Sequence, residues 1–431
     1  MRLRKERVPS RTKARVWLVL GTGLLQGCVY AAGRPPARQA GLCEVREVAR
    51  DLLEVEDGLS LYVHLGVLEP NGRGDLLLAG DISFMSARGA DSVWRPVRQD
   101  STFGVILPRA GEPIPVRSPV RTRLLAAVRA VGRPDGTWSV LFAETPEYTG
   151  DSPPDSAARL WHGVLDAGRW SPLEPIPLPP GGAVRHANAA APLLRGDTLF
   201  WALAFRGEFH DVAVFSRRGG AWTHEVVPTR FAAFYPRLAY SDTLGLVLAS
   251  VGGDPELRHS GNNLLLWARR PGWRLLSLLV PAARGSVHDP WISLEPGAEV
   301  VSWAADRVDG GPGKHARLMR GEPRPQADVT LLDSAISGLG AYPVRPLGRV
   351  DGPRWWVVEH LSQHTLWSEV RVLQEANGAL VVRATAAAPF VMGFASAMPD
   401  PASILVAGGF FSNDRSQRLA SLLVKFAVHC P

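Results

Sequence analysis

The chain has 431 residues, 46% of them hydrophobic and 21% charged, which is enough apolar material for a sizeable core. Its net charge of +7 comes mostly from the first 27 residues, which hold seven bases and one acid. Without that segment the charge falls to about +1, and the remainder has no run of Lys or Arg. Because phosphate binding needs a retained basic surface, we expect no nucleic-acid partner.

The N-terminus has the pattern of a secretory signal. Seven basic residues between positions 2 and 15 precede an apolar run at 16–25, which is too short for a permanent membrane span. The run ends in Leu25-Gln26-Gly27-Cys28, which resembles the lipobox of bacterial lipoproteins. The resemblance implies that residues 1–27 are removed, that Cys28 is lipidated with palmitate, and that Val29 directs the protein to the outer membrane. An ordinary secretory signal cut nearby, or an uncleaved anchor, is the alternative.

The rest of the chain divides into a tether and one large domain. Residues 28–41 are rich in Gly and Pro and poor in apolar side chains, which predicts a flexible tether. Residues 42–431 consist of short apolar runs separated by Gly, Pro, Asp and Asn, without a sustained helical period. The runs 197–205, 211–216 and 221–227 predict strand, loop, strand, tight turn and strand. We therefore expect an all-β domain.

The strand pattern repeats along the domain. One marker is a proline at the opening of a strand, at Pro192, Pro236, Pro290, Pro343 and Pro389, with spacings of 44, 54, 53 and 46 residues. A second marker is a tryptophan after a tight turn, at Trp170, Trp222 and Trp273, which lie 52 and 51 residues apart. Four strands per 40 to 50 residues are typical of a β-propeller, whose blades bury their faces against one another.

The repeats predict seven blades, although six blades with an irregular N-terminal extension remain an alternative. The predicted units are 59–117, 119–176, 190–228, 235–281, 289–333, 341–386 and 388–430. The last unit has only three strands, and the strand at 44–55 has no partner of its own. Pairing of that strand with the C-terminal one would close the ring and bring Cys43 next to Cys430.

A disulfide between Cys43 and Cys430 is allowed in an extracytoplasmic compartment and would close a loop of nearly the whole domain. It would leave Cys28 as the lipid acceptor and no cysteine unassigned. Two buried free thiols are the alternative.

The predicted binding face is the rim that carries the links between second and third strands and between blades. These links are long and polar, whereas the third-to-fourth turns are tight. The candidate binding residues on this rim and on the opening strands are Arg121, Arg237, Arg345, His288, Asp289, Glu208 and Glu359. The alternatives are structural: His288-Asp289-Pro290 as a satisfied turn, and Tyr235 and Tyr342 as blade-packing residues. His360 and His364 lie in a predicted loop, so we expect no metal site, and no cofactor motif occurs.

Two turns carry a resemblance to a known family. Ser216-Arg217-Arg218-Gly219-Gly220-Ala221-Trp222 and Asp166-Ala167-Gly168-Arg169-Trp170 resemble degenerate Asp-box turns of the sialidase-like propeller superfamily. The resemblance implies a propeller with arginines for a substrate carboxylate, an acid and a nucleophile around the channel. The nucleophilic tyrosine and the acid loop of that family are not identifiable in this sequence.

The sequence thus favours a monomeric, membrane-tethered, extracytoplasmic β-propeller that acts as a binding or scaffold module for a glycan or an envelope protein. The alternatives are a sialidase-like glycoside hydrolase and an envelope assembly factor. A central pocket with at least two arginines and two carboxylates would favour the hydrolase.

Overall fold

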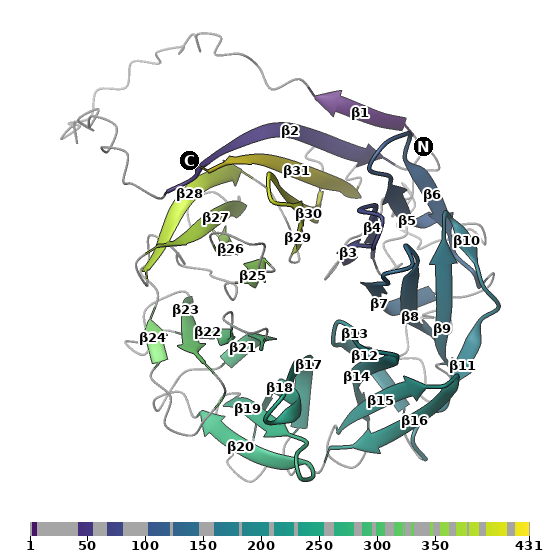
Figure 1. Cartoon of the computed structure of the whole chain (residues 1–431). Helices are drawn as coiled ribbons and strands as arrows, with labels where there is room; N and C mark the ends of the chain where they lie inside the picture. Colours follow the sequence, from purple (N-terminus) through teal and green to yellow (C-terminus); the bar gives the residue numbers. More distant parts are fainter. Residues whose placement is uncertain are drawn as a thin grey trace, which may run out of the picture.

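In the computed structural model the described strands form seven sheets arranged around a common axis (Figure 1). The predicted seven-bladed β-propeller is confirmed, and the six-bladed alternative is wrong. No helix occurs among the described residues, so none of them forms a helical membrane span. The structure describes residues 2–6, 42–54, 67–80, 102–120, 124–145, 159–180, 183–206, 211–227, 232–253, 263–279, 287–294, 299–306, 314–321, 323, 329–331, 345–347, 354–361, 368–376, 379–387, 394–411 and 419–430.

Each blade is an antiparallel sheet whose first strand, here called the inner strand, lies nearest the axis (Figure 1). Blade 1 contains β3 (Val67–Pro70), β4 (Leu76–Ala79), β5 (Thr102–Leu107) and β6 (Ile114–Arg117). Blade 2 contains β7 (Leu124–Gly132), β8 (Trp138–Thr145), β9 (Arg159–Asp166), β10 (Arg169–Trp170) and β11 (Glu174–Ile176). Blade 3 contains β12 (Ala183–Ala189), β13 (Leu193–Arg195), β14 (Thr198–Arg206), β15 (Val212–Arg218) and β16 (Ala221–Val226).

The remaining blades follow the same order. Blade 4 contains β17 (Ala232–Ser241), β18 (Gly245–Gly253), β19 (Asn263–Ala268) and β20 (Arg274–Leu279). Blade 5 contains β21 (Val287–Ser293), β22 (Val300–Asp306), β23 (Lys314–Arg320) and β24 (Val329–Leu331). Blade 6 contains β25 (Arg345–Leu347), β26 (Trp355–Leu361), β27 (Ser368–Ala376) and β28 (Ala379–Ala387). Blade 7 contains β29 (Phe394–Asp400), β30 (Ser403–Phe411), β31 (Leu419–His429) and β2 (Glu44–Glu54).

The apolar core is divided among the seven interfaces between neighbouring blades. Each cluster of buried side chains in the described residues combines two adjacent blades. Consecutive residues of a strand point to opposite neighbours: Trp201 packs toward blade 2 and Ala202 toward blade 4. In the same way, Trp355 packs toward blade 7 and Trp356 toward blade 5. Because both faces of the middle strands are buried, these strands are apolar at nearly every position.

The inner strands differ from the prediction at the repeated prolines. β17 and β21 begin before their prolines, at Ala232 and Val287, and Tyr235-Pro236 and Asp289-Pro290 are the residues at which the pairing register shifts. In blade 3 the proline likewise separates β12 from β13. Proline has no N–H for the ladder, so it is tolerated at a bulge. The repeated proline therefore marks a bulge within the inner strand in blades 4 and 5.

The ring closes as predicted. β2 pairs antiparallel with β31, with Val45 opposite Val428, and a disulfide joins Cys43 to Cys430 across 387 positions of sequence. Cys43 is also tied to blade 6, because its N–H donates to Gln374 Oε1 (2.9 Å) and its carbonyl accepts from Arg383 Nε (2.8 Å). β1 (Arg2–Glu6), which lies within the predicted signal peptide, pairs with the outer edge of β2.

Candidate functional site

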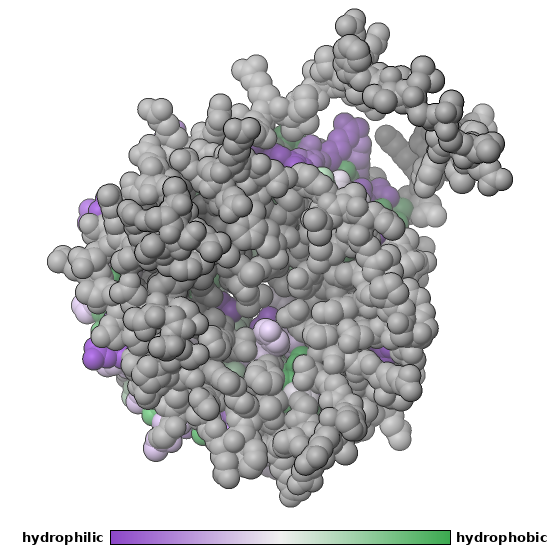
Figure 2. Space-filling view, turned by 180° about the vertical axis from the view of Figure 1, so that it is seen from behind, coloured by the Kyte–Doolittle hydropathy of each residue, from purple (hydrophilic) through white to green (hydrophobic). Residues whose placement is uncertain are grey.

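The inner strands of blades 2 to 5 share a bulge near their first residues. In β7, β12, β17 and β21 the pairing register shifts before Arg129, Ala189, Arg237 and Trp291 respectively. An inner strand begins where the link from the preceding blade arrives, so the bulges lie toward the predicted binding rim, called the loop-rich rim. In the space-filling view from behind, hydrophilic and hydrophobic described residues lie together near the centre (Figure 2).

In blades 2 and 4 the side chain of the residue after the bulge contacts the residue at the equivalent position of the next blade. The guanidinium of Arg129, 6% exposed, donates to the carbonyls of Val128 (2.6 Å) and Ala189 (3.1 Å). Arg237 donates to the carbonyl of Pro236 (3.0 Å) and lies 6.0 Å from the ring centroid of Trp291. Both arginines thus link adjacent inner strands around the axis.

Tyr235 occupies the bulge of β17 with a φ of +50°. A bulky non-glycine residue in the left-handed region costs free energy, on the order of 1 kcal/mol. The interactions of the surrounding sheet must offset that cost. Strained residues of this kind gather at binding sites, which makes this bulge a candidate contact position.

The structure places five of the predicted site residues on strands. Arg237, His288, Asp289 and Arg345 lie on the inner strands of blades 4, 5 and 6, and Glu359 lies on β26 opposite Val370. Arg237 is brought against blade 5 by its contact with Trp291. Arg121 and Glu208 lie outside the described residues, as does the lipidation candidate Cys28.

Glu69 lies on the inner strand of blade 1, and its carboxyl group faces blade 2. Its Oε1 accepts the N–H of Gly132 on blade 2 (3.1 Å), and its backbone carbonyl accepts Trp138 Nε1 (2.9 Å). Burial raises the pKa of Glu69 to about 7, and the hydrogen bond from Gly132 opposes that shift. The carboxyl group is therefore partly protonated at neutral pH.

His162, Glu174 and Arg217 form a chain between blades 2 and 3. Arg217 binds both carboxylate oxygens of Glu174 at 2.8 Å, and His162 Nδ1 lies 3.2 Å from Glu174 Oε2. Arg217 lowers the pKa of Glu174, and burial lowers the pKa of His162, which is 2% exposed and packs edge-on against Trp222. The imidazole is buried, whereas Glu174 and Arg217 are partly exposed, and the contacts of the chain hold the two blades together.

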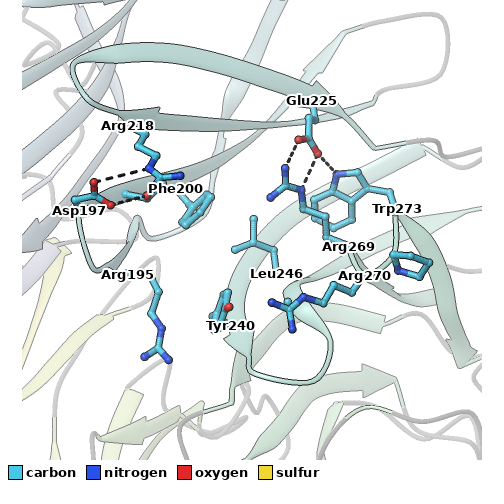
Figure 3. Close-up of a pocket in the computed structure, with 14 residues that line it drawn as sticks. Arg195, Asp197, Phe200, Arg218, Glu225, Tyr240, Leu246, Arg269, Arg270 and Trp273 are labelled. Carbon is cyan, nitrogen blue, oxygen red and sulfur yellow. Dashed lines mark hydrogen bonds and ion pairs between the residues drawn. The ribbon is translucent and has the colours of Figure 1, made fainter.

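A cavity of about 680 Å³ lies between blades 3 and 4 on the opposite rim, called the tight-turn rim (Figure 3). Its walls are the turns that join first to second and third to fourth strands of these blades. Four arginines and two carboxylates line it: Arg195, Arg218, Arg269, Arg270, Asp197 and Glu225. We call this cavity the arginine pocket.

Two groups of polar side chains flank the buried Leu246 in the arginine pocket (Figure 3). On one side Glu225 accepts from Arg269 Nε and from Trp273 Nε1, each at 2.9 Å. On the other side Arg218 Nε lies 3.8 Å from Asp197 Oδ2. Half-buried Tyr240 and Phe200 add apolar surface.

Asp242 holds the other two arginines of the pocket. Its carboxylate pairs with Arg195 (3.0 Å), and its backbone carbonyl accepts from Arg270 Nη1 (2.6 Å). Arg195 also lies 4.9 Å from the ring centroid of Tyr240. The convergence of these residues depends on the docking of two blades.

Comparisons with known proteins identify no family for this chain. No family model and no curated protein matches the chain. A protein of unknown function from Dyadobacter fermentans is 13% identical with a TM-score of 0.47, covering 88% of this chain and 99% of its own. An α-L-arabinofuranosidase from Fusarium graminearum in complex with an iminosugar inhibitor is 12% identical with a TM-score of 0.46, over 70% of this chain and 92% of its own.

A Trypanosoma rangeli sialidase in complex with 2,3-difluorosialic acid is 9% identical with a TM-score of 0.41, over 77% of this chain and 55% of its own. Similarities this distant carry no information on the activity of this chain.

Proposed function

We propose that the protein is a binding or scaffold module of the cell envelope, which recognises a glycan or protein at the loop-rich end of its axis. The observation that carries this proposal is the row of bulges at matching places in four consecutive inner strands. Bulges re-aim side chains and gather beside binding sites. The blades behind them are packed on both faces, so these side chains stand on a rigid support.

The contacts of two arginines favour binding over hydrolysis. A sialidase-like site needs guanidinium groups open to a substrate carboxylate, whereas Arg129 and Arg237 donate to carbonyls of the inner strands. Diverting either guanidinium to a substrate would leave those carbonyls without that donor. The loss of a buried hydrogen bond costs about 1–3 kcal/mol.

The test compares turnover with binding on the same protein. We expect no turnover of aryl glycosides, including an aryl α-sialoside and an aryl α-L-arabinofuranoside, and saturable binding to a glycan array or an envelope protein. Asp289→Asn should weaken this binding, and the control Glu112→Gln, on an exposed turn of the opposite rim, should leave it unchanged. Turnover by the wild type that disappears in Glu359→Gln would establish the hydrolase instead.

The envelope location has a separate test. The proposed lipid on Cys28 would hold the protein at the outer membrane through the tether at 28–41. Cys28→Ala should release the protein from the membrane fraction and abolish palmitate incorporation. Unchanged fractionation of this variant would contradict the lipid anchor.

A further inference from the structure

We infer that the arginine pocket binds a small molecule that carries a carboxylate or phosphate group on a ring. The pocket opens on the tight-turn rim, opposite the proposed binding face, so this inference does not depend on the proposed function. Its volume of about 680 Å³ lies in the range of known small-molecule sites.

The net positive charge of the pocket favours an anionic ligand. Its lining has four arginines against two carboxylates, an excess of two positive charges. The excess remains one when Asp242, which pairs with Arg195 at the edge of the pocket, is counted. Guanidinium groups are planar donors that fit the two oxygens of a carboxylate or phosphate.

The four arginines differ in how firmly they are held. Arg269 is fixed, because Glu225 accepts from it twice and also from Trp273. Arg218 and Asp197 are 3.8 Å apart with side chains 80% and 75% exposed, and Arg195 and Asp242 are 58% and 82% exposed. Ion pairs this exposed contribute about 0–1 kcal/mol, so an incoming anion can replace them at little cost.

Arg270 has a different set of partners. In the described residues it makes a hydrogen bond to the backbone carbonyl of Asp242, and no carboxylate is within ion-pair distance. Its charge is therefore available to a ligand. Arg270 and Arg195 lie on either side of Tyr240 in the pocket view (Figure 3).

The apolar floor of the pocket is the reason to expect a ring in the ligand. Tyr240 and Phe200 expose part of their aromatic surface to the cavity, and Leu246 lies between the two polar groups. A flat apolar ring can cover this surface while its anionic group meets the arginines at the edge. Apolar surface beside placed charged groups is a combination found in ligand pockets.

The test is titration calorimetry of the full chain with phenyl phosphate, benzoate and the neutral phenyl β-D-glucoside. We expect at least one of the two anions to bind, more tightly at 50 mM than at 500 mM NaCl, and the glucoside not to bind. The tighter of the two anions identifies the phosphate or carboxylate class. The double variant Arg218→Gln/Arg270→Gln should bind this anion at least tenfold more weakly.

The control variant is Arg169→Gln, which removes an exposed arginine from the equivalent turn of blade 2 and should bind as the wild type does. Both pocket substitutions are at exposed positions, so a thermal melt should show the wild-type Tm. The inference is overturned if neither anion binds, if the glucoside binds as tightly as the anions, or if the double variant retains wild-type affinity. None of these outcomes bears on binding at the loop-rich rim.

Discussion

At the scale of single residues, Glu69 couples stability to pH. Its pKa rises from an ordinary value of 4.5 to about 7 because the carboxyl group is buried between blades 1 and 2. The folded state therefore holds this proton more tightly than the unfolded state does. The contribution of Glu69 is fully present below about pH 4.5 and is lost as the pH rises through 7.

The Glu69→Gln variant should not lose stability in this way as the pH rises. Its amide keeps an acceptor for the N–H of Gly132 and carries no charge. The unfolding free energy of the variant minus that of the wild type should be larger at pH 8 than at pH 5 by roughly 2 kcal/mol. Denaturant unfolding at both pH values measures this gain. The control Glu112→Gln, at an exposed turn, should show none, and an equal gain in both variants would contradict the assignment.

Arg217 and Arg218 are neighbours with different contacts, which gives a matched pair of variants. Arg217 binds both oxygens of Glu174, whereas Arg218 makes one long, exposed ion pair. Arg217→Gln should lower the unfolding free energy by about 1 kcal/mol, and Arg218→Gln by much less. Chemical denaturation of both variants at pH 7 compares them.

The effect of Arg217→Gln should also depend on pH. Arg217 lowers the pKa of Glu174, so its stabilising contribution is present above 4.5 and is lost as the pH falls through the lowered folded value. The difference between this variant and the wild type should therefore disappear in acid. A difference that persists unchanged at pH 3 would show that the contact acts through packing alone.

At the scale of elements, tight turns were predictable because their sequences are local signals. Trp170 and Trp222 follow turns in which two consecutive residues have positive φ, and glycine fills three of the four such positions. Ala167, with φ of +46°, is the exception. Type I′ hairpin turns of this kind favour Asn-Gly.

Ala167→Asn should therefore stabilise the β9–β10 turn by roughly 0.5–1 kcal/mol, because asparagine tolerates the left-handed region better than alanine does. Thermal unfolding measures this as a raised Tm. The control Ala221→Asn, on the strand after the neighbouring turn, should not raise the Tm. A lower Tm for Ala167→Asn would show that the turn does not require a positive φ at this position.

Inner-strand boundaries were less predictable than the turns. The proline pattern predicts strand openings, but in blades 4 and 5 the prolines lie at bulges within longer strands. In blade 2 the bulge holds Ala127 and Val128 and has no proline, so Arg129 was not among the predicted site residues. Arg129 occupies the position that matches Arg237, and this match follows from the pairing register of the two strands.

At the scale of the whole molecule, three sequence features predicted ring closure. The last unit lacked a strand, the segment at 44–55 lacked a partner, and the two remaining cysteines flanked both. The arginine pocket could not be found in this way. Its lining comes from separate turns of two blades, and the angle at which those blades dock is set by the side chains of their shared core.

The disulfide should contribute strongly to the stability of the ring, because it joins positions 387 residues apart. Cys430→Ser removes it at an exposed position and leaves the buried Cys43 in its contacts with blade 6. The chain-entropy model gives up to about 5 kcal/mol for such a loop. Thermal unfolding without reductant should show a lower Tm for Cys430→Ser than for the wild type. Dithiothreitol should lower the Tm of the wild type to the same value.

Closure of the ring supports both proposed binding sites, because it turns seven blades into one rigid scaffold. The most direct test is intact-mass analysis of protein purified without reductant and treated with iodoacetamide in denaturant, which exposes the buried Cys43. We predict no alkylation of Cys43 or Cys430 before reduction and alkylation of both after it. Alkylation of both cysteines before reduction would contradict the covalent closure of the propeller.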